Sequence, residues 1–326
     1  MSLPPSLIFL GGLVVITLGA EMILRGSTRI AAMLGVKPIL IGLTVVAIGT
    51  STPELAVGIA AVAEGKGALA VGNIAGTNIV NILLILGLSA AIRPLPLQLL
   101  SIRLDVPVMI GTALVLLVMA ADGVLSRLDG FLLLVAAVAY IVALVHLSRK
   151  ESPALQHEFA EEYGKRALLR GPTARRAWNT LLVAAGIALT VLGAELLVAG
   201  AVDIARSFGI SDAVIGLTIV AIGTSAPELA TTIVSTIRND RDVAVGNLIG
   251  SSITNIVVIL GLTCVVAPSG VDVSDDILWL DLPLAAGVAI VCLPVFRSDQ
   301  MVSRREGIAF VVAYLLYLGT LIIVRA

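Results

Sequence analysis

Two segments of the chain are written twice at one fixed spacing. Residues 42–54 read GLTVVAIGTSTPE and residues 216–228 read GLTIVAIGTSAPE, with eleven of thirteen positions identical at an offset of 174. At the same offset, AVGNIAGTNIVNILLILGL (70–88) matches AVGNLIGSSITNIVVILGL (244–262). The fold must therefore contain two similar halves, and each half brings one glutamate, Glu54 or Glu228, inside an apolar segment.

The composition is that of a membrane protein. Hydrophobic residues make up 58% and charged residues 13% of the chain, and the mean hydropathy is +1.08, whereas soluble domains carry about 25% charged residues. The absence of a basic stripe argues against a nucleic-acid partner, and the absence of a GxxxxGK(S/T) sequence argues against a nucleotide. Cys264 and Cys292 lie in apolar segments and are expected to be buried free thiols.

Runs of about 20 apolar residues, long enough to cross the hydrocarbon core of a bilayer, recur along the chain. They predict an all-α integral membrane protein with ten transmembrane helices. The predicted helices are about 6–25, 39–62, 68–91, 104–121, 129–147, 179–201, 212–236, 243–266, 279–296 and 307–324. The first and the sixth can extend into amphipathic turns that carry Arg25 and Arg29, or Asp203 and Arg206.

Basic residues set the orientation, because cytoplasmic connections carry an excess of lysine and arginine. With both termini outside, 17 of the 21 basic residues fall on the inner side of the cytoplasmic membrane. Lys66, Arg127, Arg206 and Arg325 remain outside. Five spans per half is an odd number, so the second half crosses the bilayer in the opposite sense and the halves are inverted five-helix repeats.

The repeats divide the chain into three parts. Residues 1–147 form the first repeat, with its motif at 42–88, and residues 178–326 form the second, with its motif at 216–262. The polar stretch 148–177 is expected to be a cytoplasmic linker, folded as a solvated helix or loop. The N-terminal apolar run is longer than a signal peptide and lacks a basic start, so it is expected to be a retained first span.

Prolines break the repeated helices next to the glutamates. Pro53 and Pro227 lack an N–H, and each ring clashes with the carbonyl four residues back, which frees the carbonyls of Gly49 and Gly223. A hard cation is a natural partner for such carbonyls, for hydroxyls and for a carboxylate. In the first copy Thr50 and Ser51 lie four and three residues before Glu54 and can share its face, and Thr224 and Ser225 stand at the same spacing before Glu228.

The next helix of each half carries polar side chains at every fourth position, on nearly one face. They are Asn73, Thr77 and Asn81 in the first half and Asn247, Ser251 and Asn255 in the second. The two deeper members of each set are expected to contact an ion, and Asn73 and Asn247 partly to join helices. Gly72 with Gly76, and Gly246 with Gly250, are small-residue pairs that allow close helix packing.

GTSTPEL (49–55) with GNIAGTNIVN (72–81), and GTSAPEL (223–229) with GNLIGSSITN (246–255), resemble the paired alpha-repeats of sodium/calcium exchangers, a branch of the cation/Ca²⁺ antiporters. The resemblance covers essentially the whole chain and implies Na⁺/Ca²⁺ antiport by alternating access. It implies a central Ca²⁺ site made by Glu54, Glu228 and the carbonyls of Thr50 and Thr224, flanked by Asn81 and Asn255. It also implies one Na⁺ site at Ser51, Ser251 and the Ala47 carbonyl, and an inverted counterpart at Ser225, Thr77 and the Ala221 carbonyl.

Differences from related branches of the superfamily narrow the choice of coupling ion. Proton/Ca²⁺ exchangers carry an extra glutamate where this chain has Gly76 and Gly250, and K⁺-dependent exchangers carry aspartate where it has Asn255. The favoured function is Na⁺/Ca²⁺ exchange, and proton- or K⁺-coupled antiport of Ca²⁺ or another divalent cation is the alternative.

Two other classes of function fit the sequence less well. A channel would require a ring of equivalent subunits or carbonyl loops, and an intramembrane hydrolase would require a general base near Ser51 or Ser225. The histidines are His146, at a predicted helix end, and His157, in the linker. The chain is therefore not expected to be an enzyme or to hold a cofactor, and one copy is sufficient for a complete site.

Overall fold

The structure is a computed structural model that describes residues 4–34, 38–99, 101–148, 172–208 and 221–325. Its described elements in the first half are α1 (Pro5–Leu34), α2 (Pro38–Ile41), the π-helical η1 (Gly42–Val46), α3 (Ala47–Thr50), α4 (Thr52–Ala63), α5 (Gly67–Ile79), π-helical η2 (Val80–Leu86), α6 (Gly87–Ile92), β1 (Leu95–Pro96), π-helical η3 (Ser101–Asp105), α7 (Val106–Met119), the 3₁₀ turn η4 (Ala120–Asp122), β2 (Val124–Leu125) and α8 (Arg127–Ser148).

The second half follows the same order. Its described elements are α10 (Pro172–Ser207), α12 (Ala221–Thr224), α13 (Ala226–Ile237), α14 (Arg241–Thr254), π-helical η6 (Asn255–Leu260), α15 (Gly261–Val266), β3 (Val271–Asp272), π-helical η7 (Ile277–Asp281), α16 (Leu282–Ser298), β4 (Met301–Val302) and α17 (Arg304–Arg325). Even the π-helical segments recur, since η6 and η7 stand where η2 and η3 stand in the first half.

The predicted spans agree with these helices. Among the described residues, seven helical stretches are long and apolar enough to cross a membrane, and the bent pair Ile39–Thr50 and Thr52–Ala63 makes an eighth. α17 lies at the tenth predicted span, although it is not among these eight stretches. α12 and α13 lie in the predicted span 212–236, of which residues 212–220 lie outside the described residues. α1 runs on to Leu34 and α10 to Ser207, so the amphipathic extensions are helical. Residues 172–177, assigned to the linker from the sequence, belong to α10, and 149–171 lie outside the described residues.

Two short antiparallel strand pairs join the halves. β1 pairs with β4, with Leu95 opposite Val302, and β2 pairs with β3, with Leu125 opposite Val271. Paired connections must lie on the same side of the membrane, so an even number of crossings separates them along the chain. The ten-span assignment places six crossings between β1 and β4 and four between β2 and β3. The strand pairs therefore agree with a count that includes the span at 212–236.

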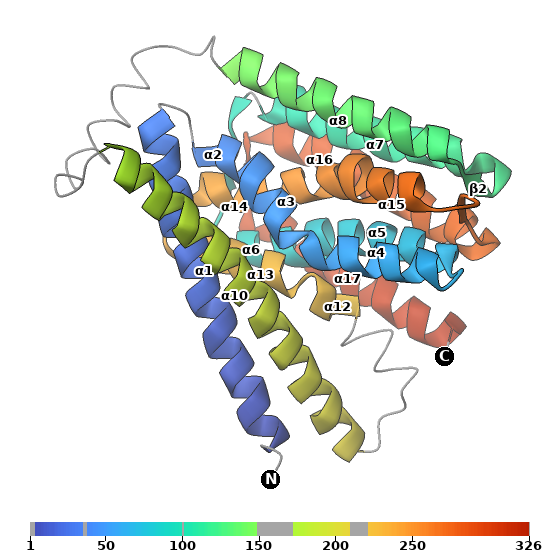
Figure 1. The fold of residues 1–326 in the computed structure, drawn as a ribbon, viewed down its shortest axis with the longest axis horizontal. Helices are drawn as coiled ribbons and strands as arrows, with labels where there is room; N and C mark the ends of the chain where they lie inside the picture. Colours follow the sequence, from blue (N-terminus) through green and yellow to red (C-terminus); the bar gives the residue numbers. More distant parts are fainter. Residues whose placement is uncertain (1–3, 35–37, 100, 149–171, 209–220, 326) are drawn as a thin grey trace.

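The first helices of the two halves, α1 and α10, pack along each other and run obliquely to the other helices of the bundle (Figure 1). Glycines spaced by seven allow this contact: Gly12, Gly19 and Gly26 on α1, and Gly186, Gly193 and Gly200 on α10. A Cβ atom added at Gly12 would lie 2.5 Å from the backbone nitrogen of Leu197, and one at Gly19 would lie 2.6 Å from that of Thr190. The backbones of the two helices touch because these positions have no side chain.

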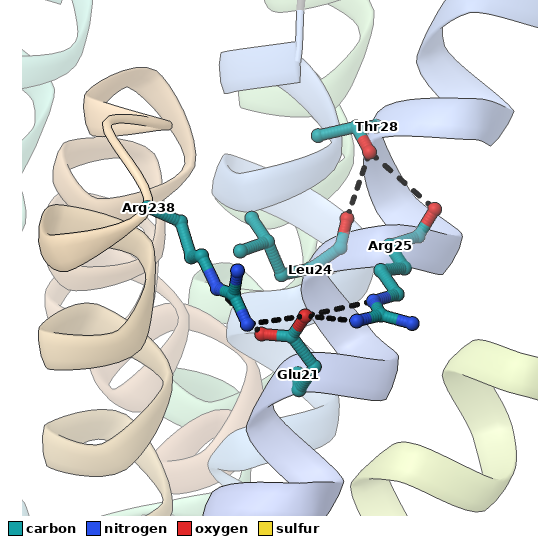
Figure 2. A network of polar contacts seen from close by, with 5 residues as sticks. All are labelled: Glu21, Leu24, Arg25, Thr28 and Arg238. Atoms are coloured by element: carbon teal, nitrogen blue, oxygen red, sulfur yellow. Dashed lines mark hydrogen bonds and ion pairs between the residues drawn. The ribbon is translucent and has the colours of Figure 1, made fainter.

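A charged network ties α1 to the end of α13 (Figure 2). Glu21 binds Arg25, one turn along the same helix, at 2.7 Å, and Arg238, just past α13, at 3.1 Å. Figure 2 shows the Glu21 carboxylate between the two guanidinium groups. Both arginines are more than half exposed, so the network belongs to the rim of the helix bundle.

Candidate cation-binding site

Both glutamate-bearing helices break at the predicted place. Ser51 (φ −82°, ψ 13°) separates α3 from α4, and Ser225 (φ −86°, ψ 8°) separates α12 from α13. The two helices of the first half bend by 41° at this break. Pro53 and Pro227 each occupy the first turn after the break, where a missing N–H costs no helical hydrogen bond.

The sequence predicted that the Gly49 carbonyl, freed by Pro53, would need a cation as its partner. In the structure this carbonyl already has a partner within the protein. The Thr52 hydroxyl donates to it at 2.8 Å, because a threonine three residues on can reach back across the break. The second half has Ala226 at the position of Thr52 and offers no such hydroxyl.

The Glu228 carboxylate joins both halves of the molecule. Its Oε1 accepts a hydrogen bond from the Ser51 hydroxyl of the first half at 3.1 Å and from the Ser251 hydroxyl at 3.4 Å. Glu54 and Glu228 are both fully buried. Ser51 stands three residues before Glu54, so one centre contains the breaks of both helices.

Several buried oxygen and nitrogen atoms around this centre have no hydrogen-bond partner among the described residues. They are Glu54 Oε1 and Oε2, Glu228 Oε2, Ser225 Oγ, Asn81 Oδ1 and Nδ2, and Asn255 Oδ1. Leaving a buried carboxylate without a partner is strongly unfavourable, so such groups pair with a cation or a proton. Carboxylate, hydroxyl and amide oxygens are the ligands that hard cations take.

The remaining predicted site residues lie on the same elements. Thr50 and Ala47 are fully buried on α3, and Thr77 is buried on α5. The Ala47 carbonyl accepts from the Ser51 N–H at 3.1 Å, and the Thr50 hydroxyl oxygen lies 3.4 Å from it. Ala221 and Thr224 are the first and last residues of α12.

Asn247 and Thr232 line the centre as well. Asn247 was expected partly to join helices and does so here, whereas the contact of Thr232 was not predicted from the sequence. The Thr50 hydroxyl donates to Asn247 Oδ1 at 3.2 Å, and Asn247 Nδ2 donates to the Thr232 hydroxyl at 3.3 Å. Asn247 therefore links α3 of the first half to α13 of the second. Its place in the repeated GN motif was the available signal, whereas nothing in the sequence marks Thr232.

Asn78 was missed too. Its Nδ2 donates to the Ser252 carbonyl at 3.0 Å, and its Oδ1 accepts from Asn255 Nδ2 at 3.1 Å. Asn78 was overlooked because it falls outside the four-residue spacing of Asn73, Thr77 and Asn81.

The repeat glycines of α14 pack on the first half. A Cβ at Gly246 would lie 2.7 Å from the Ile39 carbonyl oxygen, and one at Gly250 would lie 2.7 Å from Leu43 Cα. The close helix packing expected from this pair is confirmed. The segment that would face Gly72 and Gly76 in the same way, 213–217, lies outside the described residues.

Two inverted repeats of membrane-spanning helices that share one buried, oxygen-rich acidic centre define a secondary transporter for cations. The family model described as sodium/calcium exchanger protein matches residues 5–146 and 178–323. The chain belongs to the sodium/calcium exchanger family and is an integral membrane protein.

Individual relatives agree with this assignment. CaxA from Alkalimonas amylolytica is 36% identical over 94% of this chain and 95% of its own length. The sodium/calcium exchanger MaX1 from Methanosarcina acetivorans is 31% identical over 97% of both. A solved structure of the sodium-calcium exchanger NCX_Mj, soaked with Na⁺ and Sr²⁺, superimposes with a TM-score of 0.82 at 28% identity and covers 98% of this chain and 99% of that one.

Proposed function

We propose that this protein exchanges Na⁺ for Ca²⁺ across the cytoplasmic membrane by alternating access around one central site. The observation that supports it most directly is the Ser51–Glu228 hydrogen bond, because it brings the broken helices of two inverted halves to one acidic centre. Two carboxylates neutralise one Ca²⁺ or two Na⁺, so both ions can compete for the same place.

The ligand assignment is part of the same proposal. Ca²⁺ binds between Glu54 and Glu228 with the carbonyls of Thr50 and Thr224, and Asn81 and Asn255 flank it. The Na⁺ ligands are Ser51, Ser251 and the Ala47 carbonyl on one side and Ser225, Thr77 and the Ala221 carbonyl on the other. The orphaned oxygens of Glu54, Asn81 and Asn255 support this set, since a bound cation satisfies all of them.

Packing at Gly250 supports Na⁺ rather than H⁺ as the coupling ion. Any side chain at this position would meet the Leu43 backbone, so the additional glutamate of proton exchangers does not fit on α14 without moving η1. K⁺-coupled exchange remains the alternative that Asn255 disfavours, because an amide supplies an oxygen but no charge. The protein holds no resident cofactor in this proposal, it is not an enzyme, and one copy in the lipid bilayer is sufficient.

The orientation belongs to the proposal as well. Both termini lie outside and the connection between α8 and α10 is cytoplasmic, an assignment that rests on the 17-to-4 distribution of basic residues. The strand pairs add support for the relative sides of the connections, because connections that pair lie on the same side of the membrane.

Ion flux through the purified protein in lipid vesicles tests the function. Ca²⁺ should enter vesicles loaded with Na⁺ and should not enter vesicles loaded with choline at the same pH. Uptake that ignores Na⁺ and follows a pH gradient would assign proton coupling, and uptake that requires K⁺ in addition would assign K⁺ coupling. Wild-type vesicles that take up no Ca²⁺ under any gradient would contradict the proposal as a whole.

A further inference from the structure

The amide of Asn255 has two ends, and only one of them can bind a cation. Asn255 is fully buried at the start of η6. Its oxygen is an acceptor, whereas its NH₂ group carries partial positive charge and repels a cation. Something must therefore select which end faces the acidic centre.

A chain of two hydrogen bonds makes this selection, and its direction is fixed by a backbone carbonyl. The Ser252 carbonyl can only accept, so the side chain of Asn78 must present its NH₂ to it, as it does at 3.0 Å. The oxygen of Asn78 then points to Asn255, which must present its own NH₂, as it does at 3.1 Å. The oxygen of Asn255 is left on the other side of its amide, buried and without a hydrogen-bond partner among the described residues.

We infer that Asn78 is a positioning residue for cation binding, which holds the amide of Asn255 with its oxygen toward the ion. The inference rests on the proposed function, because it assigns a role within that cation site. Asn78 itself does not touch the ion, since both polar ends of its side chain are occupied by Ser252 and Asn255.

Within the part of the chain that the structure describes, Asn255 has such a positioning partner and its repeat counterpart does not. The repeat places Ser252 at the position of Asn78 and Asn81 at the position of Asn255. The Ser252 hydroxyl donates instead to the Leu248 carbonyl of its own helix at 2.9 Å, and neither end of the Asn81 amide has a partner among the described residues. The two asparagines of the site are therefore unequal, with Asn255 fixed in advance and Asn81 free to turn.

Asn78→Leu is the appropriate test variant. Leucine has a similar size and cannot form hydrogen bonds, and the side chain at 78 borders a small cavity with Ile82 and Met109 as apolar neighbours. The variant should raise both the Kd for Ca²⁺, measured by equilibrium binding to the purified protein, and the KM for Ca²⁺ uptake by about tenfold. The maximal rate should change by less than about twofold, since the carboxylates are untouched.

A double-mutant cycle with Asn255→Asp separates positioning from packing. A carboxylate at position 255 has no NH₂ group to donate to the Asn78 oxygen, so the orienting hydrogen bond does not exist in the N255D background. N78L should therefore not raise the Kd for Ca²⁺ in that background. Thr263→Val is the matched control, because it removes a buried hydroxyl whose one hydrogen bond among the described residues goes to the Ile259 carbonyl of its own helix run, at 2.8 Å. It should leave the Kd unchanged.

Three results would contradict these expectations in different ways. An unchanged Kd in N78L, with normal uptake by the wild type, would overturn the inference alone. A loss of the same size with and without N255D would assign Asn78 to helix packing and would also overturn it. A wild type that neither binds nor transports Ca²⁺ would overturn the proposed function and the inference together.

Discussion

The Ser51 hydroxyl of the first half donates a 3.1 Å hydrogen bond to the Glu228 carboxylate of the second half. Its repeat counterpart, Ser225, has no hydrogen-bond partner for its hydroxyl among the described residues, and neither oxygen of Glu54 has one. The site is therefore symmetric in sequence and asymmetric in structure, with one glutamate held by hydroxyls and the other free to take a cation.

Both glutamates should be essential. Glu54→Gln or Glu228→Gln removes half of the negative charge that balances Ca²⁺ in a site without bulk water, so Na⁺-dependent Ca²⁺ uptake should fall at least 100-fold, on the order of 3 kcal/mol. Uptake into vesicles measures it, with the yield of monodisperse protein as the test of folding. Glu64→Gln, the same change at the exposed end of the first broken helix, is the control and should transport normally. A folded variant at either site residue with near-normal flux would refute the shared site.

Connections on opposite sides of the membrane should react with different reagents. Lys66 and Arg305 are exposed, and the ten-span orientation places Lys66 outside and Arg305 in the cytoplasm. With Cys264 and Cys292 changed to alanine, Lys66→Cys should react with a membrane-impermeant maleimide in intact cells, and Arg305→Cys only after the cells are opened. Equal reaction of both in intact cells would mean that the number of spans is wrong.

Glycine at the α1–α10 contact should be indispensable. A Cβ at Gly193 would overlap the backbone of Ile16, and backbone atoms of two packed helices cannot move aside, so Gly193→Ala should destabilise the protein by about 1–3 kcal/mol or more. Thermal unfolding in detergent measures this. Gly11→Ala is the control on the same helix pair, because a Cβ there meets nothing within 4 Å. A G193A protein as stable as G11A would show that the two helices do not pack this closely.

The turns between the repeated helices need a left-handed residue. Gly65 has φ +70° and Asn239, at the equivalent position, has φ +67°. The N–H of the next residue closes each turn, from Lys66 to the Ala61 carbonyl at 2.7 Å and from Asp240 to the Ser235 carbonyl at 2.9 Å. Gly65→Ala should lower the free energy of unfolding by about 1 kcal/mol, because alanine disfavours positive φ. A steric clash does not contribute, since a Cβ at this position meets nothing within 4 Å. Asn239→Gly should be neutral or slightly stabilising in the same melting experiment, and a stabilising G65A would contradict the turn geometry.

The Glu21 network should contribute little to stability. Arg25 and Arg238 are more than half exposed, and exposed ion pairs contribute about 0–1 kcal/mol and are screened by salt. Glu21→Gln should therefore lower the free energy of unfolding by less than about 1 kcal/mol, and by less in high salt. Thermal unfolding at low and high salt measures this change. If Glu21→Gln lowered the free energy of unfolding by more than about 1 kcal/mol, and did so in high salt as well, the ion pairs of Glu21 would have to be shielded from solvent.

Much of the molecule could be predicted from the sequence because the relevant physics is local. A bilayer requires about 20 apolar residues per crossing, so the helices could be placed from composition alone. An odd number of spans in each repeat means that the second repeat crosses the bilayer in the opposite sense to the first. A proline breaks its helix at the residues just before it, so the breaks at Ser51 and Ser225 could be predicted from Pro53 and Pro227.

The contacts between the halves were decided only by the tertiary structure. Ser51 and Ser225 stand at equivalent positions of the two repeats. Only the packing of the two halves determines that Ser51 binds the glutamate of the other half, Glu228. The hydroxyl of Thr52 donates a hydrogen bond to the Gly49 carbonyl, for which the sequence had predicted a cation as partner. This contact forms because the side chain of Thr52 folds back across the helix break. Asn78 acquires its role from Ser252 and Asn255 on another helix, since the direction of an amide depends on partners that lie far away along the chain.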